Sequence, residues 1–462
     1  MTTDVLGSAK TVSVNVFAQH AERLRQAMAQ MGRSRSRGAG FEPGFELPEA
    51  TDGLAGFFGA ADLRFADLGT AGRSRMVLLD LMGNPGTRTV KTLASHVIVA
   101  RAARHTQVTG EPVMILTPSS ANKATALRDA VLRAYRFGLA DPGTLRIVTV
   151  VPDLARPKLW SSALDEDPAL AVRNPMCVLG RGHRAHVKSL ALGALEECEG
   201  ELFARTGIRL WHTLDLANYQ CADAVRAFAE REALPAEPGT TRAHAHAVSS
   251  AFGLLGHHFG TTLLPRSPGL PQYFLVQHLA TPDMVLSLHD MTPPDYRFDA
   301  AAGLYRQDVE PRYPAATADI GENLEPTFYT RSPATSPAMN EIIRGQGGGG
   351  VVVSLYECLG RYDEVRALLA GAGVRLPADP RTLREWSLVM VMTGVLNAID
   401  RGLLDVDEVV VHGSGSYSTD DFTPMPDRAI HEIGEVRDLR RVIFEAASAT
   451  GTGEAAGTGE VV

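Results

Sequence analysis

Short apolar runs alternate with amphipathic stretches along most of this chain. Seven of the runs have the length and the β-branched content of buried strands, at residues 76–82, 112–118, 145–151, 243–248, 273–279, 350–354 and 408–413. Apolar positions with helical spacing predict helices over residues 91–104, 124–137, 185–206, 222–233 and 386–401. Buried strands that are each followed by a helix indicate an α/β fold, in which helices cover both faces of mostly parallel sheets.

The two ends of the chain carry a different pattern. Residues 1–60 predict one helix (14–31), a basic stretch RSRSRG that we interpret as a solvated linker, and a segment broken by glycine and proline. We therefore expect an N-terminal extension there. Residues 447–462 are rich in Gly, Thr and Ala, which predicts a disordered tail because such a segment buries little apolar surface. The run GQGGGG (345–350) is interpreted as a flexible connection.

Composition and charge narrow the class of protein. A chain of 462 residues is too long for one small core, so two domains are expected. A net charge of −8 gives no reason to expect nucleic acid or an anionic membrane as a partner. No apolar run reaches the roughly 18 residues of a spanning helix, and the first residues lack the pattern of a secretion signal. The four cysteines form no CxxC pair, so we expect neither disulfides nor zinc but a cytoplasmic protein.

Two turns between a strand and a helix carry candidate chemistry. Lys91 follows the Gly/Pro turn GNPGTRTV at the start of a helix, and lysine can form a Schiff base. About thirty residues later, the turn SSAN (119–122) opens onto another helix, where free amides favour anions. The pair indicates a site for pyridoxal phosphate (PLP). Taken singly, the SSAN turn is more typical of a helix cap, since Ser and Asn side chains accept hydrogen bonds from free amides.

Two further turns follow predicted strands, and ligands of parallel α/β folds bind at that end of the strands. The first is VSSAFGLLG (248–256) and the second is HGSGSYS (412–418), which lacks the lysine of a nucleoside-triphosphate loop. Four histidines near the first turn suggest a metal site as an alternative: His244, His246, His257 and His258. Two of them share one face of a strand, but no third ligand is assured. We therefore expect no metal and interpret them as histidines near an anionic cofactor.

The order and spacing of these turns resemble the fold-type II PLP enzymes, namely threonine synthase and the cysteine-synthase and threonine-dehydratase group. NPGTRTVKT resembles the segment of the Schiff-base lysine, and SSANKATAL resembles the family's SSGNxGxAL turn. LANYQCADAVRAFAERE (216–232) and the segment 384–416 are similar to the helix before the phosphate loop and to the closing helix, strand and glycine loop. The resemblance covers roughly residues 80–415. It implies a homodimer of two-domain subunits, with a small domain at 92–181 and a large PLP-binding domain at 61–91 and 182–446.

The resemblance also implies roles for individual residues. Lys91 would form the Schiff base and carry the α proton of the substrate, and Asn122 would bond the ring oxygen of PLP. The remaining residues implied by position would bind the phosphate (Ser249, Ser250, Gly253), the ring nitrogen (His412, with Gly413 and Ser414) and the substrate carboxylate (Ser119, Ser120, Lys123).

Three departures from the family pattern bear on function. Ala121 stands where the family has a glycine, Ala251 and Phe252 replace glycines of the phosphate loop, and His412 replaces a Ser or Thr. We therefore expect a divergent enzyme of specialised metabolism rather than a housekeeping threonine synthase. It would eliminate or replace a leaving group on a small amino acid. The alternatives are a simple eliminase or dehydratase, a non-catalytic homologue that binds PLP weakly, and a nucleotide-binding scaffold that uses GSGSYS.

Overall fold

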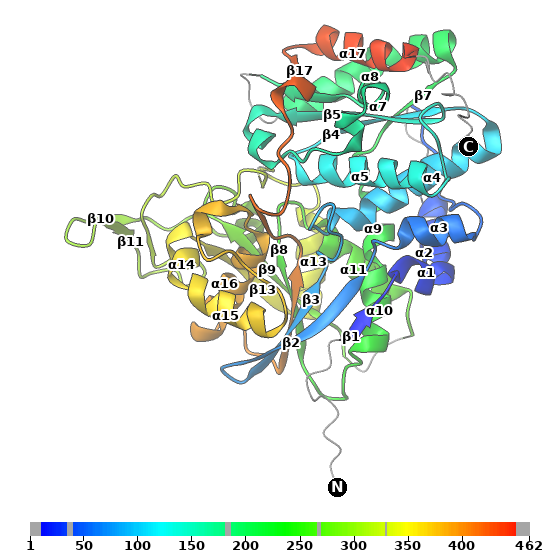
Figure 1. Ribbon diagram of the computed structural model, residues 1–462. Coiled ribbons are helices and arrows are strands. Elements are labelled where there is room, and N and C mark those ends of the chain that lie inside the picture. The colour runs from blue at the N-terminus through cyan, green and yellow to red at the C-terminus, as the bar shows by residue number, and fades with distance from the viewer. Residues whose placement is uncertain (1–10, 35–39, 181–185, 266–268, 329, 450–462) are drawn as a thin grey trace, which may run out of the picture.

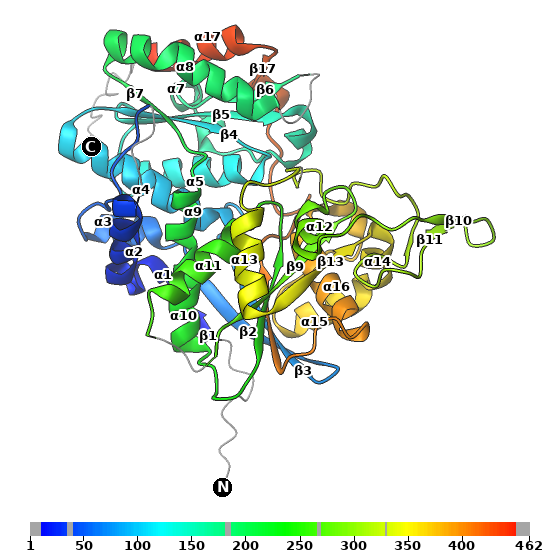
Figure 2. The same ribbon diagram turned by 180° about the vertical axis from the view of Figure 1, so that it is seen from behind.

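Two separate sheets organise the chain in the computed structural model, which describes residues 11–34, 40–180, 186–265, 269–328 and 330–449. The first has seven strands in the order β1-β2-β3-β15-β8-β9-β13, and the second has five in the order β17-β6-β5-β4-β7. They form two lobes, with α4 and α5 between them (Figure 1). The same division is visible from behind (Figure 2).

The seven-stranded sheet is parallel except at one edge, where β1, β2 and β3 run antiparallel. Every residue of the central strand β15 is buried because helices cover both faces. One face packs against α16 and the other against α10 and α11. The strands are β1 (Thr11–Ser13), β2 (Leu63–Ala71), β3 (Ser74–Asp80), β8 (Arg242–Ala247), β9 (Gln272–His278), β13 (Gly348–Val353) and β15 (Glu408–Gly413). The covering helices are α10 (Val225–Ala233), α11 (Phe252–Thr262) and α16 (Ser387–Asp400).

The five-stranded sheet is parallel throughout. Alternate residues of β4 enter different apolar clusters: Val113 and Ile115 face α4 and α5, whereas Met114 and Leu116 face α8 and α17. The sheet is thus covered on both sides, as the continuous apolar runs predict. Its strands are β4 (Val113–Pro118), β5 (Leu145–Pro152), β6 (Met176–Leu179), β7 (Arg209–His212) and β17 (Ile430–Ile433). Its helices are α4 (Lys91–Thr109), α5 (Asn122–Arg136), α8 (His186–Thr206) and α17 (Val436–Ser448).

Shorter elements connect and flank the two sheets. The hairpin β10–β11 projects from the body at the left of Figure 1, and β14 pairs with β16 beside the end of β15. The short strands are β10 (Arg297–Asp299), β11 (Leu304–Arg306), β12 (Ala316–Thr317), β14 (Leu383–Glu385) and β16 (Tyr417–Ser418). The other helices are α1 (Val16–Gln19), α2 (Ala21–Ser34), α3 (Asp52–Phe58), α6 (Ala163–Glu166), α7 (Pro168–Ala171), α9 (Leu216–Asp223), α12 (Asp283–His289), α13 (Ser336–Gln346), α14 (Leu355–Gly360) and α15 (Tyr362–Gly371). Three 3₁₀ turns cover Asp153–Lys158, Pro380–Thr382 and Asp427–Ala429.

The fold class expected from the sequence is confirmed, and all seven predicted strands are present within a few residues. The strand pairing, however, differs from the predicted division of domains. Strands β7 and β17, with α8 and α17, complete the five-stranded sheet, although the sequence placed residues 182–446 with the larger unit. Order along the chain does not reveal this, because both strands have only four residues and pair with strands distant in sequence.

The described part of the first sixty residues packs into the fold rather than forming an extension. Leu24 and Met28 of α2 and Phe57 and Phe58 of α3 are buried in the same apolar cluster as Val97 of α4. Strand β1 also adds an edge to the seven-stranded sheet. Residues 35–38 of the basic stretch and residues 450–462 of the predicted disordered tail lie outside the described residues.

The run GQGGGG (345–350) was predicted to be a flexible connection. In the structure it ends α13 and begins β13. Gly348 opens β13 with φ +122°, and a Cβ there would lie 1.9 Å from the Tyr273 carbonyl oxygen. Glycine is therefore required for the two strands to approach. Among the described helices, none has both the length and the apolar character needed to span a bilayer. The four cysteines are buried and form no disulfide.

Candidate active site

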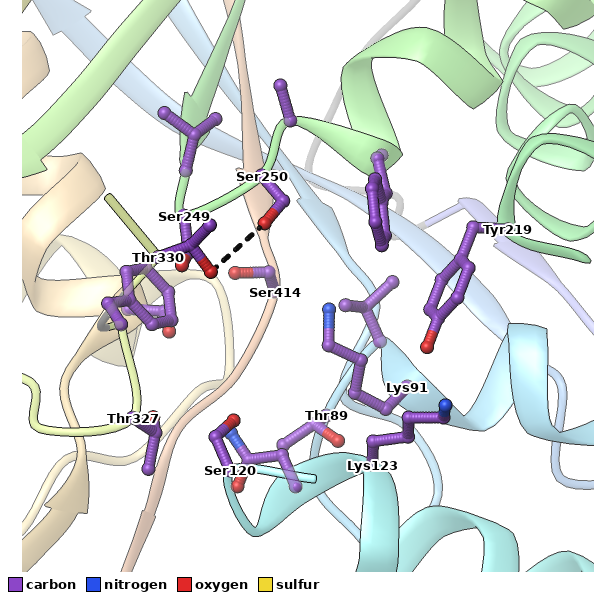
Figure 3. A pocket seen from close by; sticks show the side chains of 18 of the residues that line it. Thr89, Lys91, Ser120, Lys123, Tyr219, Ser249, Ser250, Thr327, Thr330 and Ser414 are labelled. Carbon is purple, nitrogen blue, oxygen red and sulfur yellow. Dashed lines mark hydrogen bonds between the residues drawn. The ribbon is translucent and has the colours of Figure 1, made fainter. Parts of the chain in front are cut away.

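The predicted turns converge on one cavity of about 190 Å³. Its wall contains the start of α4, the β4–α5 turn, the β8–α11 turn and the loop after β15, so both lobes contribute (Figure 3). Parallel strands place their carboxyl ends at one edge, which explains why turns far apart in sequence meet. Nine of the eleven predicted residues line the cavity: Lys91, Ser119, Ser120, Asn122, Lys123, Ser249, Ser250, Gly253 and Ser414.

Lys91 opens α4 with its amine inside the cavity (Figure 3). The turn before it is tied to the glycine loop, because Val90 N donates to Ser414 O at 2.9 Å. Burial lowers the pKa of Lys91, and the charge of Arg226 lowers it further against the opposing effects of Asp223 and Glu385. With the described residues, the amine makes no hydrogen bond. A lowered pKa leaves more of the amine neutral, which is the nucleophilic form.

The SSAN turn acts in part as the helix cap that we considered. Ser119 Oγ accepts hydrogen bonds from the backbone N–H of Ala121 at 3.2 Å and of Ala124 at 2.9 Å. Asn122 lines the cavity, but its side chain also has partners behind the wall. Its Nδ2 donates to Glu385 Oε2 at 2.6 Å, and its Oδ1 accepts from the Tyr417 hydroxyl at 2.7 Å.

Ala121 has a backbone conformation that suits glycine, with φ +131° and ψ −65°. Such a residue stores about 1–3 kcal/mol of strain. We expect Ala121→Gly to raise the free energy of unfolding by up to about 1 kcal/mol, because relief of strain exceeds the added entropy of an unfolded glycine. Chemical denaturation measures the change. The matched control is Ala124→Gly, at an equally buried position of the same cluster inside α5, where a loss of stability is expected. Equal losses in both variants would refute the strain.

The β8–α11 turn presents a helix start to the cavity. Ala251 adopts a left-handed conformation with φ +51° and leads into the eleven-residue helix α11. Gly253 lies against the guanidinium of Arg226, since a Cβ there would be 2.7 Å from Arg226 Nη1. Phe252, which replaces a glycine of the family pattern, packs on Tyr219 with ring centroids 4.6 Å apart. Free amides at this helix start suit an anionic group.

His412 and Gly413 are not among the residues that line the cavity. Arg226 Nη1 lies 3.3 Å from His412 Nδ1, and His412 Nε2 lies 3.0 Å from His244 Nδ1. Because a guanidinium only donates, His412 Nδ1 accepts, and Nε2–H then donates to His244. Burial lowers the pKa of His412 well below its ordinary value, so the ring is neutral. Arg226 and His246 therefore occupy the wall where the sequence placed His412.

Glu230 lies beside two of the four histidines, His244 and His257, which the sequence did not indicate. Glu230, His244 and His257 bring potential metal-ligand atoms within 4.8 Å of one another. Glu230 already accepts from Arg242 Nη1 at 2.6 Å and lies 2.7 Å from His257 Nε2. These contacts account for the buried carboxylate as part of a hydrogen-bonded chain. His258 lies beside Gln346 instead, as expected for neighbouring histidines on a helix.

Several residues of the cavity wall were missed by the sequence analysis, namely Lys188, Tyr219, Asp223 and Arg226, whereas His246 had been expected near an anionic cofactor. Three of them had a signal, because Tyr219, Asp223 and Arg226 lie in the recognised segment 216–232, although its Asp223–Arg226 ion pair at 2.7 Å was not foreseen. Lys188 lies in α8 and had no motif around it. His246 Nε2 is buried and has no hydrogen-bond partner in the described part of the chain.

Lys123 is the second amine of the cavity. Its Nζ donates to Thr213 O at 3.3 Å, and the amine lies 5.9 Å from the centre of the Tyr219 ring. Burial lowers the pKa of Lys123 to about 7, with contributions from the charges of Lys91 and Lys188. Among the described residues that line the cavity, Lys91, Lys123, Lys188 and Arg226 outnumber the single carboxylate Asp223, which favours an anionic ligand.

This lowered pKa predicts a pH dependence of stability. Between about pH 7 and the ordinary lysine pKa, the unfolded chain binds a proton at Lys123 that the folded chain has lost. Stability is therefore expected to rise with pH across that window in the wild type more than in Lys123→Met. Urea unfolding of both proteins at a series of pH values gives the comparison. If stability changes with pH equally in the two proteins, the pKa of Lys123 is not lowered by folding.

Comparison with solved structures identifies the fold. PLP-bound threonine synthase from Brucella melitensis is 12% identical, with a TM-score of 0.50 over 81% of this chain and 79% of that chain. Threonine synthase from yeast (12%, TM-score 0.48, 84% and 81% covered) and an L-serine ammonia-lyase from Rhizomucor miehei (12%, TM-score 0.45, 75% and 90%) also match. The chain has the two-domain fold of the fold-type II PLP-dependent enzymes.

The sequence places the chain in a family within that fold. The family described as "Family of unknown function (DUF6002)" matches residues 12–447, and the chain belongs to it. No curated protein matches the chain in sequence.

The residues around the cavity fit PLP. Lys91 presents an amine without a hydrogen-bond partner in the described chain, and His246 presents a buried nitrogen that also lacks one. The amides at the start of α11 and the positive charges of Arg226 and Lys123 suit a phosphate. These groups would hold the aldehyde and the phosphate of the cofactor.

Proposed function

We propose that the protein is a PLP-dependent enzyme that eliminates or replaces a leaving group on the β or γ carbon of a small amino acid. The observation that carries the proposal is the position of the Lys91 amine, inside the cavity where the anion-binding start of α11 and the SSAN turn meet. When bound, PLP supplies an electron sink for charge that develops at the α carbon of an amino acid. The two-domain fold supports the same assignment.

Different residues of the cavity bind the cofactor, its phosphate and the substrate. Lys91 Nζ holds the cofactor and then accepts or returns a proton, for which its lowered pKa suits it. The backbone amides of residues 249–253 bind the phosphate, and Ser249 and Ser250 add hydroxyl groups. Ser120 and Lys123, at the start of α5, bind the substrate carboxylate.

A non-catalytic homologue is the second candidate, because the chain departs from the family pattern at Ala121, at Ala251 and Phe252, and at His412. The Phe252 ring packs on Tyr219, and this contact supports a phosphate turn that stays open to the cofactor. Ala121 retains a backbone conformation typical of glycine, which preserves the shape of the turn at the cost of strain. A turn held in that conformation supports retained catalysis over decay of the site.

A spectrum and a product assay test the proposal. Purified protein incubated with PLP is expected to develop the visible absorption band of a lysine-bound cofactor and to gain thermal stability. Small amino acids with β or γ leaving groups are then screened, with release of a keto acid indicating elimination and a new amino acid indicating replacement. A band without turnover would favour the binding homologue. Stabilisation by nucleotides but not by PLP would favour the nucleotide scaffold.

Three expectations from the sequence extend this proposal. We propose a homodimer, a cytoplasmic location and a role in specialised metabolism, each on the resemblance and composition described above. Light scattering coupled to gel filtration would test the oligomeric state.

A further inference from the structure

A buried ionic network lies behind Asn122, on the side away from the cavity. Lys158 Nζ donates to Glu325 Oε1 and to Glu385 Oε2, each at 2.8 Å. The side chains of both glutamates are 0% exposed and that of Lys158 is 6% exposed. The network joins the two lobes, because Lys158 follows β5 whereas Glu385 belongs to β14. None of these three residues lines the cavity.

The network reaches Asn122 through two hydrogen bonds. Asn122 Nδ2 donates to the same Glu385 oxygen that Lys158 contacts, at 2.6 Å. On the other side, the Tyr417 hydroxyl donates to Asn122 Oδ1 at 2.7 Å. Both terminal atoms of the amide are thereby engaged, and the side chain cannot rotate without losing a buried bond.

The chemistry of the partners fixes which way the amide faces. A carboxylate oxygen that also accepts from an ammonium can only accept from Asn122, so the amide nitrogen must face Glu385. The oxygen then faces Tyr417, whose hydroxyl must donate. One amide N–H remains for a ligand in the cavity that Asn122 lines.

Glu385 is the member of the network that keeps its charge. Burial raises its pKa, but Lys158, with hydrogen bonds from Ser387 and Asn122, outweighs burial and lowers the pKa overall. For Glu325, burial and the charge of Glu385 prevail and raise the pKa. A proton taken up by this network thus goes to Glu325, which does not contact Asn122.

We propose that Glu385, held ionised by Lys158 and assisted by Tyr417, is a positioning residue that orients Asn122 so that its remaining N–H is presented to the ring oxygen of the cofactor. The inference rests on the proposed function, because it assigns a cofactor atom to Asn122. Its chemical content is a charge-assisted chain from the Lys158 ammonium through the Glu385 carboxylate to the Asn122 amide. An N–H so directed favours the anionic form of the oxygen that it contacts.

The test is the absorption spectrum of the PLP-loaded protein. The visible band reports the form with an anionic ring oxygen, and the near-ultraviolet band reports the form with a neutral hydroxyl. In Glu385→Met, we expect the ratio of visible to near-ultraviolet absorbance to fall about tenfold, the effect of one hydrogen bond to a charged group. Glu385→Gln keeps an acceptor oxygen beside Asn122 and is expected to restore most of the ratio. Tyr417→Phe removes only the second bond and should shift the ratio in the same direction by a smaller factor.

Glu325→Met is the matched control, since it removes the other carboxylate of Lys158 without touching Asn122. We expect that variant to lose thermal stability but to keep the wild-type ratio. Equal ratios in wild type, Glu385→Met and Tyr417→Phe would overturn the inference, as would an equal fall in Glu325→Met. Should Glu385→Met fail to fold, Tyr417→Phe decides the question, because it removes the second bond that holds the Asn122 amide. A wild-type protein that shows no visible band with PLP would instead reject the proposed function, so the two failures are distinguishable.

Discussion

Replacing Lys91 by alanine is expected to abolish attachment of PLP and to reduce turnover by at least about a thousandfold. The amine lies in the cavity without a hydrogen-bond partner in the described chain, and its pKa is lowered, first of all by burial. The cavity residues Lys123 and Lys188 also carry amines, yet neither follows the turn that Val90 ties to the glycine loop. Because covalent attachment and proton transfer require the same atom, its loss removes both.

Borohydride reduction of the PLP-treated protein, followed by peptide mapping, measures the attachment directly. The modified peptide is expected to contain Lys91 in the wild type and to be absent from Lys91→Ala. Lys123→Ala serves as the control and should retain the modification at Lys91. Modification of Lys123 instead, or unchanged turnover in Lys91→Ala, would show that the cavity has been assigned to the wrong amine.

Replacing Lys158 by methionine is expected to lower the free energy of unfolding by about 3–5 kcal/mol. This value is typical when one partner of a buried ion pair is removed and the opposite charge stays behind. Here two carboxylates would remain in a site where their side chains are 0% exposed. Methionine matches the aliphatic length of lysine, so the loss would arise from charge rather than from a cavity.

The expected loss should also depend on pH. Without Lys158, burial raises the pKa of both glutamates above that of the unfolded chain, and their charge then destabilises the fold at neutral pH. The penalty is relieved as pH falls through those raised values, because the carboxyl groups become neutral. Urea unfolding of wild type and Lys158→Met from neutral to acidic pH should therefore converge. A difference below about 1 kcal/mol at neutral pH would indicate that the glutamates find other partners.

The framework of the fold could be predicted from local pattern because its central strands are continuous apolar runs. Strand β15 is buried at every position, and its sequence EVVVHG accordingly contains three consecutive valines. Strands β6, β7 and β17 have four residues each, which is too short for a period to appear. The burial of α2 was missed for another reason. The sequence shows that α2 has an apolar face, but it does not show that this face packs in a cluster with α3 and α4.

Some residues of the candidate site could be predicted from local sequence and others could not. Lys91, Asn122 and the residues of the serine turns were found because each follows a strand and precedes a helix. Arg226 and Glu385 act through contacts with residues distant in the chain, and no spacing rule relates them to their partners. His412 illustrates the limit, since the predicted strand that carries it is present while its side chain faces the buried chain of histidines.

The late position of β17 and α17 has a consequence for synthesis on the ribosome. Leu439, Val442 and Ile443 of α17 close an apolar cluster formed with β4, β5 and α8. Until residues 430–448 leave the exit tunnel, strand β6 has an open edge and this cluster faces water. The nascent chain thus carries an exposed, aggregation-prone surface through much of its elongation, a state in which chaperones commonly engage folding intermediates.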